Sequence, residues 1–547
     1  MLNKNTAIFF SFVLLACGCT KLNENLGNNF TNQQTSTGLG AAGTGLILQG
    51  AYADLATPFN NQDRVFSLEE NSTDESLVPT RGGDWDDNGV WRVIHNHTWN
   101  ADHDQLLQTF NLLNKLNFDA TNVLAFNPNK EQAAEARFLR AYSLYYLLDL
   151  FGQYPFRNPG DNLLNAPKVY SGDSAVQFII SELTAILPDL DSKNDMTKAN
   201  PDAAKALLMR CYLNRGAFNN RQSPTFDAGD LQQVITLGND IISSGKYSYM
   251  SEYFDNFTAG IQSTEGIFAY PNHSGVSANN SGIDARWMMT FHYNEYRKQA
   301  PNAGWNGFST VSDFYKTFGA TTPATLTQAA DSFLDGRIGI RYNKNSTPYS
   351  GIRPGMLIGQ QYDESGKPLK DRKGNPLAFD PNISPDMIET GSNLEVTGIR
   401  VAKYVPDFSD RPDTSTVGAY YSSNSGNWLM LIRYPEVVLM VAEAKMRSGD
   451  NAGALSMVNA LRVARHAAPL PSMTLVNTGN VDDPTTLLAE TGRELYWESL
   501  RRTNLIRFGV FNVLWQYKPS DDPKYLLFPI PNQALAANPN LKQNPGY

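Results

Sequence analysis

Cysteine, histidine and long apolar runs are scarce in this sequence, and two of these shortages exclude a class of protein. Three cysteines in 547 residues exclude a disulfide framework, and no apolar run is long enough to predict a membrane-spanning helix. Basic residues are outnumbered by acidic ones, 45 against 54, and the net charge of −9 disfavours a general nucleic-acid binder. The apolar share of 41% excludes a disordered chain and allows a large core.

The N-terminal segment is unlike the rest of the chain. Lys4 supplies a short basic region, and the apolar run from Ala7 to Ala16 is too short to span a bilayer. The sequence then places small residues next to Cys17 and Cys19, which resembles a bacterial lipobox. We therefore predict a lipoprotein signal peptide over residues 1–18, a lipid anchor on Cys19 and a flexible tether over residues 19–36. Cys17 is the alternative lipidation site.

The body of the chain is predicted to be mostly α-helical. Helical spacing marks Leu46–Leu55, Leu106–Leu124, Glu131–Phe151, Ala203–Gly216, Tyr434–Leu461 and Leu487–Phe508. Small and large residues alternate in several of these segments, and the turn Ser448–Asp450 divides one of them into a helix pair of the tetratricopeptide type. Residues 246–428 are rich in Gly, Ser, Asn, Pro and aromatics, so we expect a loop-rich binding region there. A helical stretch over 429–510 and a Pro- and Asn-rich tail follow.

Several longer segments resemble one known family. They are EARFLRAYSLYYLLDLFGQYPF (Glu135–Phe156), AKALLMRCYLNRG (Ala204–Gly216), NGFSTVSDF (Asn306–Phe314), RYPEVVLMVAEA (Arg433–Ala444), GRELYWESLRRTNLIRFG (Gly492–Gly509), LFPIP, and NPNLKQNPGY ending at Tyr547. On these residues the chain is similar to the SusD/RagB family of outer-membrane nutrient-uptake lipoproteins. Asn504 departs from the family pattern, in which an acid is frequent at this point.

The resemblance implies a fold, a location and a partner. It implies degenerate tetratricopeptide-like helix pairs that scaffold an irregular ligand-binding region, with an N-terminal helical region over 37–220 and a C-terminal region over 221–547. Such proteins are lipid-anchored at the surface of the outer membrane. They capture nutrients, most often oligosaccharides, and deliver them to a SusC-like TonB-dependent transporter.

Three motifs match a cofactor or metal site only in outline. Gly38–Gly43 spells GxGxxG, but it follows a polar tether and not the strand that a dinucleotide site requires. Asp84, Asp86, Asn88 and Gly89 begin like an EF-hand loop, yet His95 stands where the bidentate glutamate belongs. His95, His97 and His103 lack a further ligand of defined spacing, so we interpret them as surface histidines. No cofactor or metal is predicted, although calcium remains open.

Other conspicuous residues are interpreted as structural. Glu494, Glu498, Arg501 and Arg502 lie at helical spacing, which predicts a charge network along one helix face. Cys211 lies in an apolar helical pattern and is expected to be a buried, inert thiol. The four aromatic residues of the Glu131–Phe151 helix are expected in the core: Phe138, Tyr142, Tyr145 and Tyr146.

Two sets of aromatic and charged residues are the candidate ligand contacts. Aromatic faces and polar groups on glycine-bearing loops suit a sugar ring, which has one apolar face and many hydroxyl groups. The first set is Arg81, Asp84, Trp85 and Trp91, and the second is Trp287, Tyr293, Tyr296 and Trp305. The alternative for each aromatic residue is that it packs its loop onto the helices.

Three functions are compatible with these features. The first is a non-catalytic, lipid-anchored binding protein that passes its ligand to a transporter. A surface glycosidase is the second, with an acid and a base drawn from Asp84, Asp86 and Asp87 or from Glu69, Glu70 and Asp74. The third is a protein that uses its helix pairs to bind peptides.

The lipobox yields a prediction of its own. We expect Cys19 to be the first residue of the mature protein and to carry the acyl chains, because Gly18 precedes it and a polar run follows it. Intact-mass analysis of the mature N-terminus measures this. Acyl mass on Cys17, or no acyl mass at all, would contradict the assignment.

Overall fold

The computed structural model describes residues 40–193, 195–273, 282–295, 304–319, 335–339, 354–363, 367–404 and 426–547. The predicted anchor at Cys19 or Cys17, the tether over 19–36 and Tyr296 lie outside the described residues. The helices are α3 (Gly40–Ala53), α4 (Ala56–Asn60), α5 (Val65–Glu70), α6 (Val90–His95), α7 (Asp104–Val123), α8 (Lys130–Phe151), α9 (Gly172–Ile186), α10 (Pro201–Asn219), α11 (Ala228–Ser243), α12 (Ala285–Met288), α13 (Ser312–Lys316), α14 (Tyr434–Arg447), α15 (Asn451–Ala464), α16 (Leu487–Leu495), α17 (Arg501–Arg507) and α18 (Asn532–Ala537).

Strands are short and form two-stranded pairs. They are β1 (Thr80–Arg81), β2 (Gln153–Phe156), β3 (Lys168–Ser171), β4 (Gly266–Tyr270), β5 (Gly355–Leu357), β6 (Gly359–Gln360), β7 (Ala378–Phe379), β8 (Ile388–Glu389), β9 (Arg400–Ala402) and β10 (Leu429–Arg433). The pair β1–β8 is parallel, and β2–β3, β4–β10, β5–β9 and β6–β7 are antiparallel. These short strand pairs hold loops together and do not form an extended sheet.

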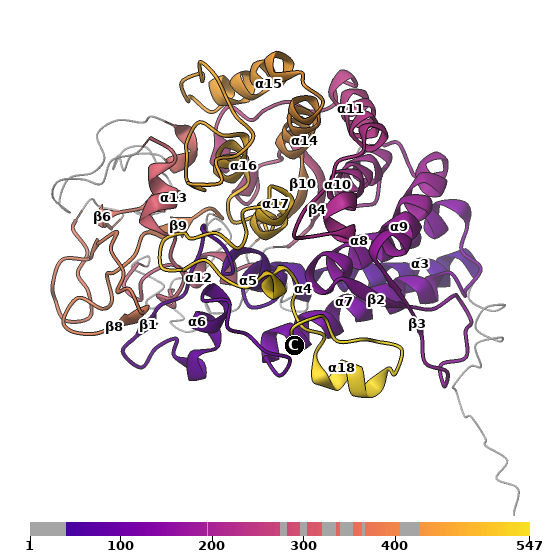
Figure 1. The fold of residues 1–547 in the computed structure, drawn as a ribbon, viewed down its shortest axis with the longest axis horizontal. Coiled ribbons are helices and arrows are strands. Elements are labelled where there is room, and N and C mark those ends of the chain that lie inside the picture. Colours follow the sequence, from indigo (N-terminus) through magenta and orange to yellow (C-terminus); the bar gives the residue numbers. More distant parts are fainter. Residues whose placement is uncertain are drawn as a thin grey trace, which may run out of the picture.

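The helices form the scaffold, and they pack in the order α7, α8, α9, α10, α11, α14, α15. Each long helix therefore lies against the next long helix of the chain, as in a tetratricopeptide array, and the turn Ser448–Asp450 joins α14 to α15 as expected. Figure 1 shows α8 to α11 on one side of the molecule and the loops that carry β1, β6 and β8 on the other. The predicted mostly helical class is confirmed.

Small residues let the helices approach closely, and aromatic residues fill the remaining space. A Cβ atom on Gly238 of α11 would lie 2.2 Å from Val441 of α14, so only glycine permits this contact. The aromatic side chains of α8 are buried as predicted: Phe138, Tyr142, Tyr145 and Tyr146. Cys211 is buried as well, and burial raises the pKa of its thiol, so it is a packing residue.

The loop-rich region is joined to the helices by β4 and β10. In the part of residues 246–428 that the structure describes, helices and strands have at most five residues each, as the composition predicts. Strand β4 pairs with β10, which runs directly into α14. The end of the loop region is thereby fixed to the helical scaffold.

The prediction of one helix over Leu487–Phe508 is wrong. The helix ends at Leu495 and restarts at Arg501, and Trp497 and Ser499 between them adopt φ of 60° and 63°. A break exposes backbone N–H groups that need acceptors. The buried carboxylate of Glu70 accepts from Ser499 N at 2.5 Å and from Leu500 N at 3.3 Å. This long-range contact compensates the break.

The prediction of a charge network along one helix face is wrong. Glu494 is buried, and both Glu494 and Glu498 bind Arg433 of another element. Glu494 accepts hydrogen bonds from Arg337 at 3.2 Å, Arg433 at 3.1 Å and Arg465 at 2.8 Å. Glu265 binds Arg433 at 2.7 Å and Arg465 at 2.8 Å. We call Glu265, Glu494 and these three arginines, all of them fully buried, the buried charge network. Burial opposes ionisation of Glu494, but the three guanidinium groups outweigh it and lower its pKa to about 2.

Arg501 and Arg502 do not lie on one helix face with Glu494. Arg501 binds Asp74, with 2.7 Å between its Nε and the carboxylate. Arg502 donates to the carbonyl oxygens of Tyr525 and Leu526 at 3.2 and 2.9 Å. The break between α16 and α17 separates these arginines from the glutamate, so each serves a different contact.

Neutralising Glu494 tests the weight of the buried charge network. We expect Glu494→Gln to lower the free energy of unfolding by about 3–5 kcal/mol, because three buried guanidinium groups lose their shared counter-charge. Urea denaturation at pH 7 measures this. Folding lowers this pKa from its ordinary 4.5, so the wild-type carboxylate stabilises fully above pH 4.5 and loses its effect as the pH falls toward 2. That part of the acid dependence should be absent in the variant.

The matched control is an exposed ion pair. Asp191 lies 3.7 Å from the largely exposed Lys193, so Asp191→Asn should change the free energy of unfolding by less than about 1 kcal/mol. Equal effects of the two substitutions would contradict a special weight of the buried charge network.

Candidate functional site

A tight turn after β1 places the first candidate residues. Arg81 N donates to Asp84 O at 2.9 Å, and Asp84 N donates back to Arg81 O at 3.2 Å, which closes the turn over Gly82 and Gly83. Trp85 follows with φ of 62°, a left-handed conformation that is uncommon for a large side chain. The turn and this conformation direct the indole away from the strand.

The indole of Trp85 is held in place by the segment that carries Trp305. Its Nε1 donates to Trp305 O at 2.7 Å. The ring packs edge-on against Trp91 and Phe308, with centroids 5.3 and 5.6 Å away. A Cβ atom on Gly307 would lie 2.3 Å from the indole, so glycine is required at that position.

Tyr293 and Arg372 complete the site from two further loops. The Tyr293 hydroxyl donates to Asp84, and the Arg372 guanidinium lies 3.9 Å above the Tyr293 ring. Arg372 also approaches the Asp84 carboxylate to 3.5 Å, and both side chains are 48% exposed. We call Asp84, Trp85, Tyr293, Trp305 and Arg372 the aromatic loop cluster. It combines partly exposed aromatic rings with an exposed donor and acceptor.

Charged groups beneath the aromatic loop cluster fix Arg372. Glu395 accepts from Arg372 Nε at 2.7 Å and lies 3.0 Å from His292 Nε2. Burial opposes ionisation of Glu395, but these hydrogen bonds outweigh it and lower its pKa. Burial also lowers the pKa of His292 to about 4, so the ring is neutral at pH 7. Burial, followed by the contact with Asp84, raises the pKa of the Tyr293 hydroxyl, which stays protonated.

The predicted ligand contacts separate into two groups. Asp84, Trp85 and Tyr293 come together, Trp305 joins them through its backbone carbonyl, and all four remain at least partly exposed. The structure gives the others a packing role, because at most 6% of each is exposed: Arg81, Trp91 and Trp287. Arg81 donates to Leu394 O and to the hydroxyls of Thr397 and Ser309 at 2.9, 2.6 and 3.1 Å, so it braces loops. Ligand contact by the first group remains a prediction.

Arg372 was not among the predicted residues. It lies in the turn Asp371–Asn375, which closes through a 2.9 Å bond from Asp371 N to Asn375 O. Charged residues are common in such turns, and 288 residues separate Arg372 from Asp84. No local signal in the sequence reports that contact.

The interpretation of the histidines as surface residues is wrong. His95, His97 and His103 are buried, and burial lowers the pKa of each. The His97 ring contacts Asp521, donates from Nε2 to Ser72 O at 2.8 Å, and stacks on Phe511 with centroids 4.6 Å apart. These contacts make the histidines core residues that tie the C-terminal segment to residues 72–97.

The acids of the EF-hand-like loop bind different cations. Asp84 contacts Arg372, whereas Asp86 binds Arg92 at 3.0 Å. Within the described ranges, no three His, Cys, Asp or Glu side chains are grouped so that they could hold a metal ion. None of the described helices is long and apolar enough to cross a membrane.

One acid set proposed for a glycosidase is structural. Glu69, Glu70 and Asp74 are fully buried. Asp74 binds Arg501, and Glu70 accepts from the backbone N–H groups of Ser499 and Leu500 just before α17, so neither faces a sugar-sized cleft. These three acids therefore cannot serve as the acid and base of a glycosidase.

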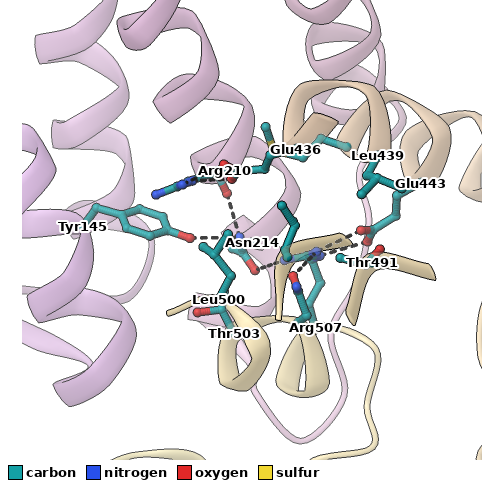
Figure 2. Close-up of a pocket in the computed structure, with 13 residues that line it drawn as sticks. Tyr145, Arg210, Asn214, Glu436, Leu439, Glu443, Thr491, Leu500, Thr503 and Arg507 are labelled. Atoms are coloured by element: carbon teal, nitrogen blue, oxygen red, sulfur yellow. Dashed lines mark hydrogen bonds and ion pairs between the residues drawn. The ribbon is translucent and has the colours of Figure 1, made fainter. Parts of the chain in front are cut away.

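A polar cavity in the helical core is a packing joint. It measures about 20 Å³, which suits at most one water molecule. Figure 2 shows Arg210 and Arg507 in its wall, bound to carboxylates of α14. Arg210 binds Glu436 at 2.6 Å, Arg507 binds Glu443 at 2.9 Å, and Asn214 bridges Arg507 to Tyr145. The cavity therefore joins α8, α10, α14 and α17 and holds no ligand-sized space.

Comparison with known proteins decides the family. The sequence model of the SusD family matches residues 264–547, which is just over half of the chain. The chain belongs to the SusD family. The match spans β4 to the C-terminus and includes the whole buried charge network, along with Tyr293, Trp305 and Arg372 of the aromatic loop cluster. Asp84 and Trp85 precede it.

Two SusD-family relatives and two solved structures illustrate the similarity. The chain is 25% identical to the starch-binding protein SusD of Bacteroides thetaiotaomicron over 78% of this chain and 75% of the relative. It is 24% identical to the SusD-like protein P2 of Formosa agariphila over the full length of both. A SusD-like protein from Bacteroides fragilis has a TM-score of 0.66 at 16% identity, covering 92% of this chain and 97% of that one. Surface glycan-binding protein A from Bacteroides thetaiotaomicron, solved with laminarihexaose, has a TM-score of 0.60 at 15% identity and covers 92% and 98%. These two structures share the SusD fold.

Proposed function

We propose that this protein is a non-catalytic, lipid-anchored binding protein that captures an oligosaccharide at the cell surface. The observation that carries the proposal is the aromatic loop cluster, in which partly exposed Trp85, Tyr293 and Trp305 lie beside the exposed pair Asp84 and Arg372. Aromatic rings suit the apolar face of a sugar ring, and the charged pair suits its hydroxyl groups. The relatives named for starch binding and solved with laminarihexaose support the same class of ligand.

Binding without hydrolysis is the favoured form of this activity. A glycosidase needs two carboxyl groups about 5–9.5 Å apart across an open cleft. Glu69, Glu70 and Asp74 are buried in contacts with the C-terminal helices. Asp84 is engaged by Tyr293 and Arg372, which suits a group that positions a ligand.

We further propose that the captured ligand passes to a SusC-like TonB-dependent transporter in the outer membrane. Membership of the SusD family carries this part, together with the predicted lipid anchor on Cys19. A multiply acylated cysteine would hold the body on the membrane surface, next to a barrel that supplies the pore.

Aromatic substitutions test the ligand site. We expect Tyr293→Ala and Trp305→Ala each to weaken oligosaccharide binding by about 1–3 kcal/mol, because each removes a stacking surface. Isothermal titration with a panel that includes starch and laminarin fragments measures this, and every sugar should be recovered intact. The control is Tyr212→Ala, a partly buried aromatic residue of α10 outside the aromatic loop cluster. Full affinity in both variants, or hydrolysis of the sugars, would contradict the proposal.

Co-purification tests the partner. We expect a TonB-dependent barrel to accompany the full-length protein from gently solubilised outer membrane, because family members act as a lid on such a barrel. Mass spectrometry identifies the partner. A Cys17→Ser and Cys19→Ser double variant is the control, since it lacks the anchor that holds the two proteins on one membrane. Recovery of the wild-type protein alone, under conditions that preserve comparable complexes, would argue against the pairing.

A further inference from the structure

A cavity on another part of the molecule lies between α7, the end of β2 and α18. Its volume is about 260 Å³, close to the lower end of the range for small-ligand pockets. Figure 1 shows α18 and α7 well separated from β1 and β8, which lie near the aromatic loop cluster. The cavity therefore belongs to a different face of the molecule.

One face of α7 forms the first wall, and its composition is unusual for a helix contact. Phe110, Asn114, Asn117, Phe118 and Thr121 line the cavity at helical spacings of three and four. Aromatic and amide side chains thus share one stripe, where a helix contact would normally present aliphatic residues. Phe118 is 43% exposed, so one aromatic ring is accessible from solvent.

Two amide groups in the walls have an unused hydrogen-bonding atom. Asn117 Nδ2 donates to Pro155 O at 3.1 Å, which fixes the amide and leaves its Oδ1 without a partner within the described residues. Asn538 Oδ1 accepts from Asn540 N at 3.1 Å, which leaves its Nδ2 unpaired in the same part of the chain. Both residues are more than nine-tenths buried. Buried polar atoms are normally paired, so one acceptor and one donor lack a partner here. Both atoms are closed to solvent, and a ligand reaches each of them once its side chain turns.

The lining of the cavity carries no acid, and one arginine holds the loop beside it. Arg157 donates to the carbonyl oxygens of Asn162, Leu163 and Asn165 at 3.1, 3.3 and 2.5 Å, which fixes the loop that leads to Pro167 in the wall. The lining contains no Asp or Glu, and the Arg157 guanidinium is committed to its own loop. A cavity of this kind favours a neutral ligand.

We propose that this cavity, which we call the amide pocket, binds one ring of a neutral sugar. The C–H face of the ring would pack on Phe118. One hydroxyl would donate to Asn117 Oδ1 and another would accept from Asn538 Nδ2, with small side-chain adjustments that admit the ligand. The amide pocket shares no residue with the aromatic loop cluster, so the proposal stands apart from the proposed function. It assigns the protein a second carbohydrate site.

A titration in a background that lacks the first site tests the proposal. The full chain carrying Tyr293→Ala and Trp305→Ala is titrated with glucose, galactose, mannose and N-acetylglucosamine, with saturation-transfer NMR as the readout. We expect at least one sugar to bind. Asn538→Asp replaces the free donor with an acceptor of the same shape, and Ala537→Trp fills the pocket from an exposed helix position. Each should weaken binding about tenfold or more, and the melting temperature of the Ala537→Trp variant should be unchanged.

The control and the contrary outcomes are defined by the same helices. Gln108→Ala lies on α7, outside the lining, and should retain full affinity. Failure of all four sugars to bind, or full affinity in Asn538→Asp and Ala537→Trp, would overturn the proposal. Binding of a blocked apolar tripeptide in place of any sugar would overturn it too and would make the pocket a peptide site. None of these results bears on oligosaccharide binding by the wild-type aromatic loop cluster.

Discussion

The energetic constraint on which this structure depends is the burial of charge around Glu494. One carboxylate holds guanidinium groups from three separate segments, at Arg337, Arg433 and Arg465. Each ion loses its hydration on folding, so the arrangement is stable only when all partners are present in good geometry. Because the partners come from the loop-rich region, from β10 and from the end of α15, they can assemble only in one relative placement of these segments. The buried charge network thus fixes the relative positions of these three segments in a chain whose middle has little regular structure.

Buried arginines extend the same principle to the loops beneath the aromatic loop cluster. Irregular backbone leaves carbonyl oxygens unpaired, and a guanidinium with five donors can satisfy several of them at once. Arg400 donates to Gly398 O at 3.0 Å and Glu395 O at 3.0 Å, and also to the side chains of Ser309 and Asn306. Arg81 reaches the same Ser309 from β1. The two arginines therefore supply hydrogen bonds that strand pairing would otherwise supply, and they support the loops that carry Trp85 and Trp305.

Local signals predicted the helices, and distant contacts decided most of the rest. The spacing of apolar residues gave α7 and α15, because amphipathic helices bury their stripe in almost any tertiary context. Small residues among large ones gave α8, α10 and α14, which are buried on most sides. It failed at Trp497, where the helix breaks because Glu70, more than 400 residues away, caps the restart. It also failed for His97, whose partners include Asp521. The prediction of Trp85 and Tyr293 as ligand contacts rests on the composition of their loops. The sequence around Arg372 has no feature that predicts its contact with Asp84. A single sequence records which residues can pair but not which distant partner they meet.

The helical scaffold and the aromatic loop cluster are under different structural constraints. The buried charge network, together with Arg81 and Arg400, fixes the bases of the loops, since their removal would leave charges or carbonyl groups unpaired in the interior. The rim residues face a weaker constraint. Tyr293 and Asp84 contact each other and Arg372, whereas Glu395 holds Arg372 from below. Tyr293 and Asp84 can therefore change together without disturbing a helix. Trp85 is the exception, because its left-handed backbone and the close approach of Gly307 bind it to the frame. The indole of Trp85 is therefore fixed, whereas Tyr293 and Asp84 beside it are under a weaker constraint.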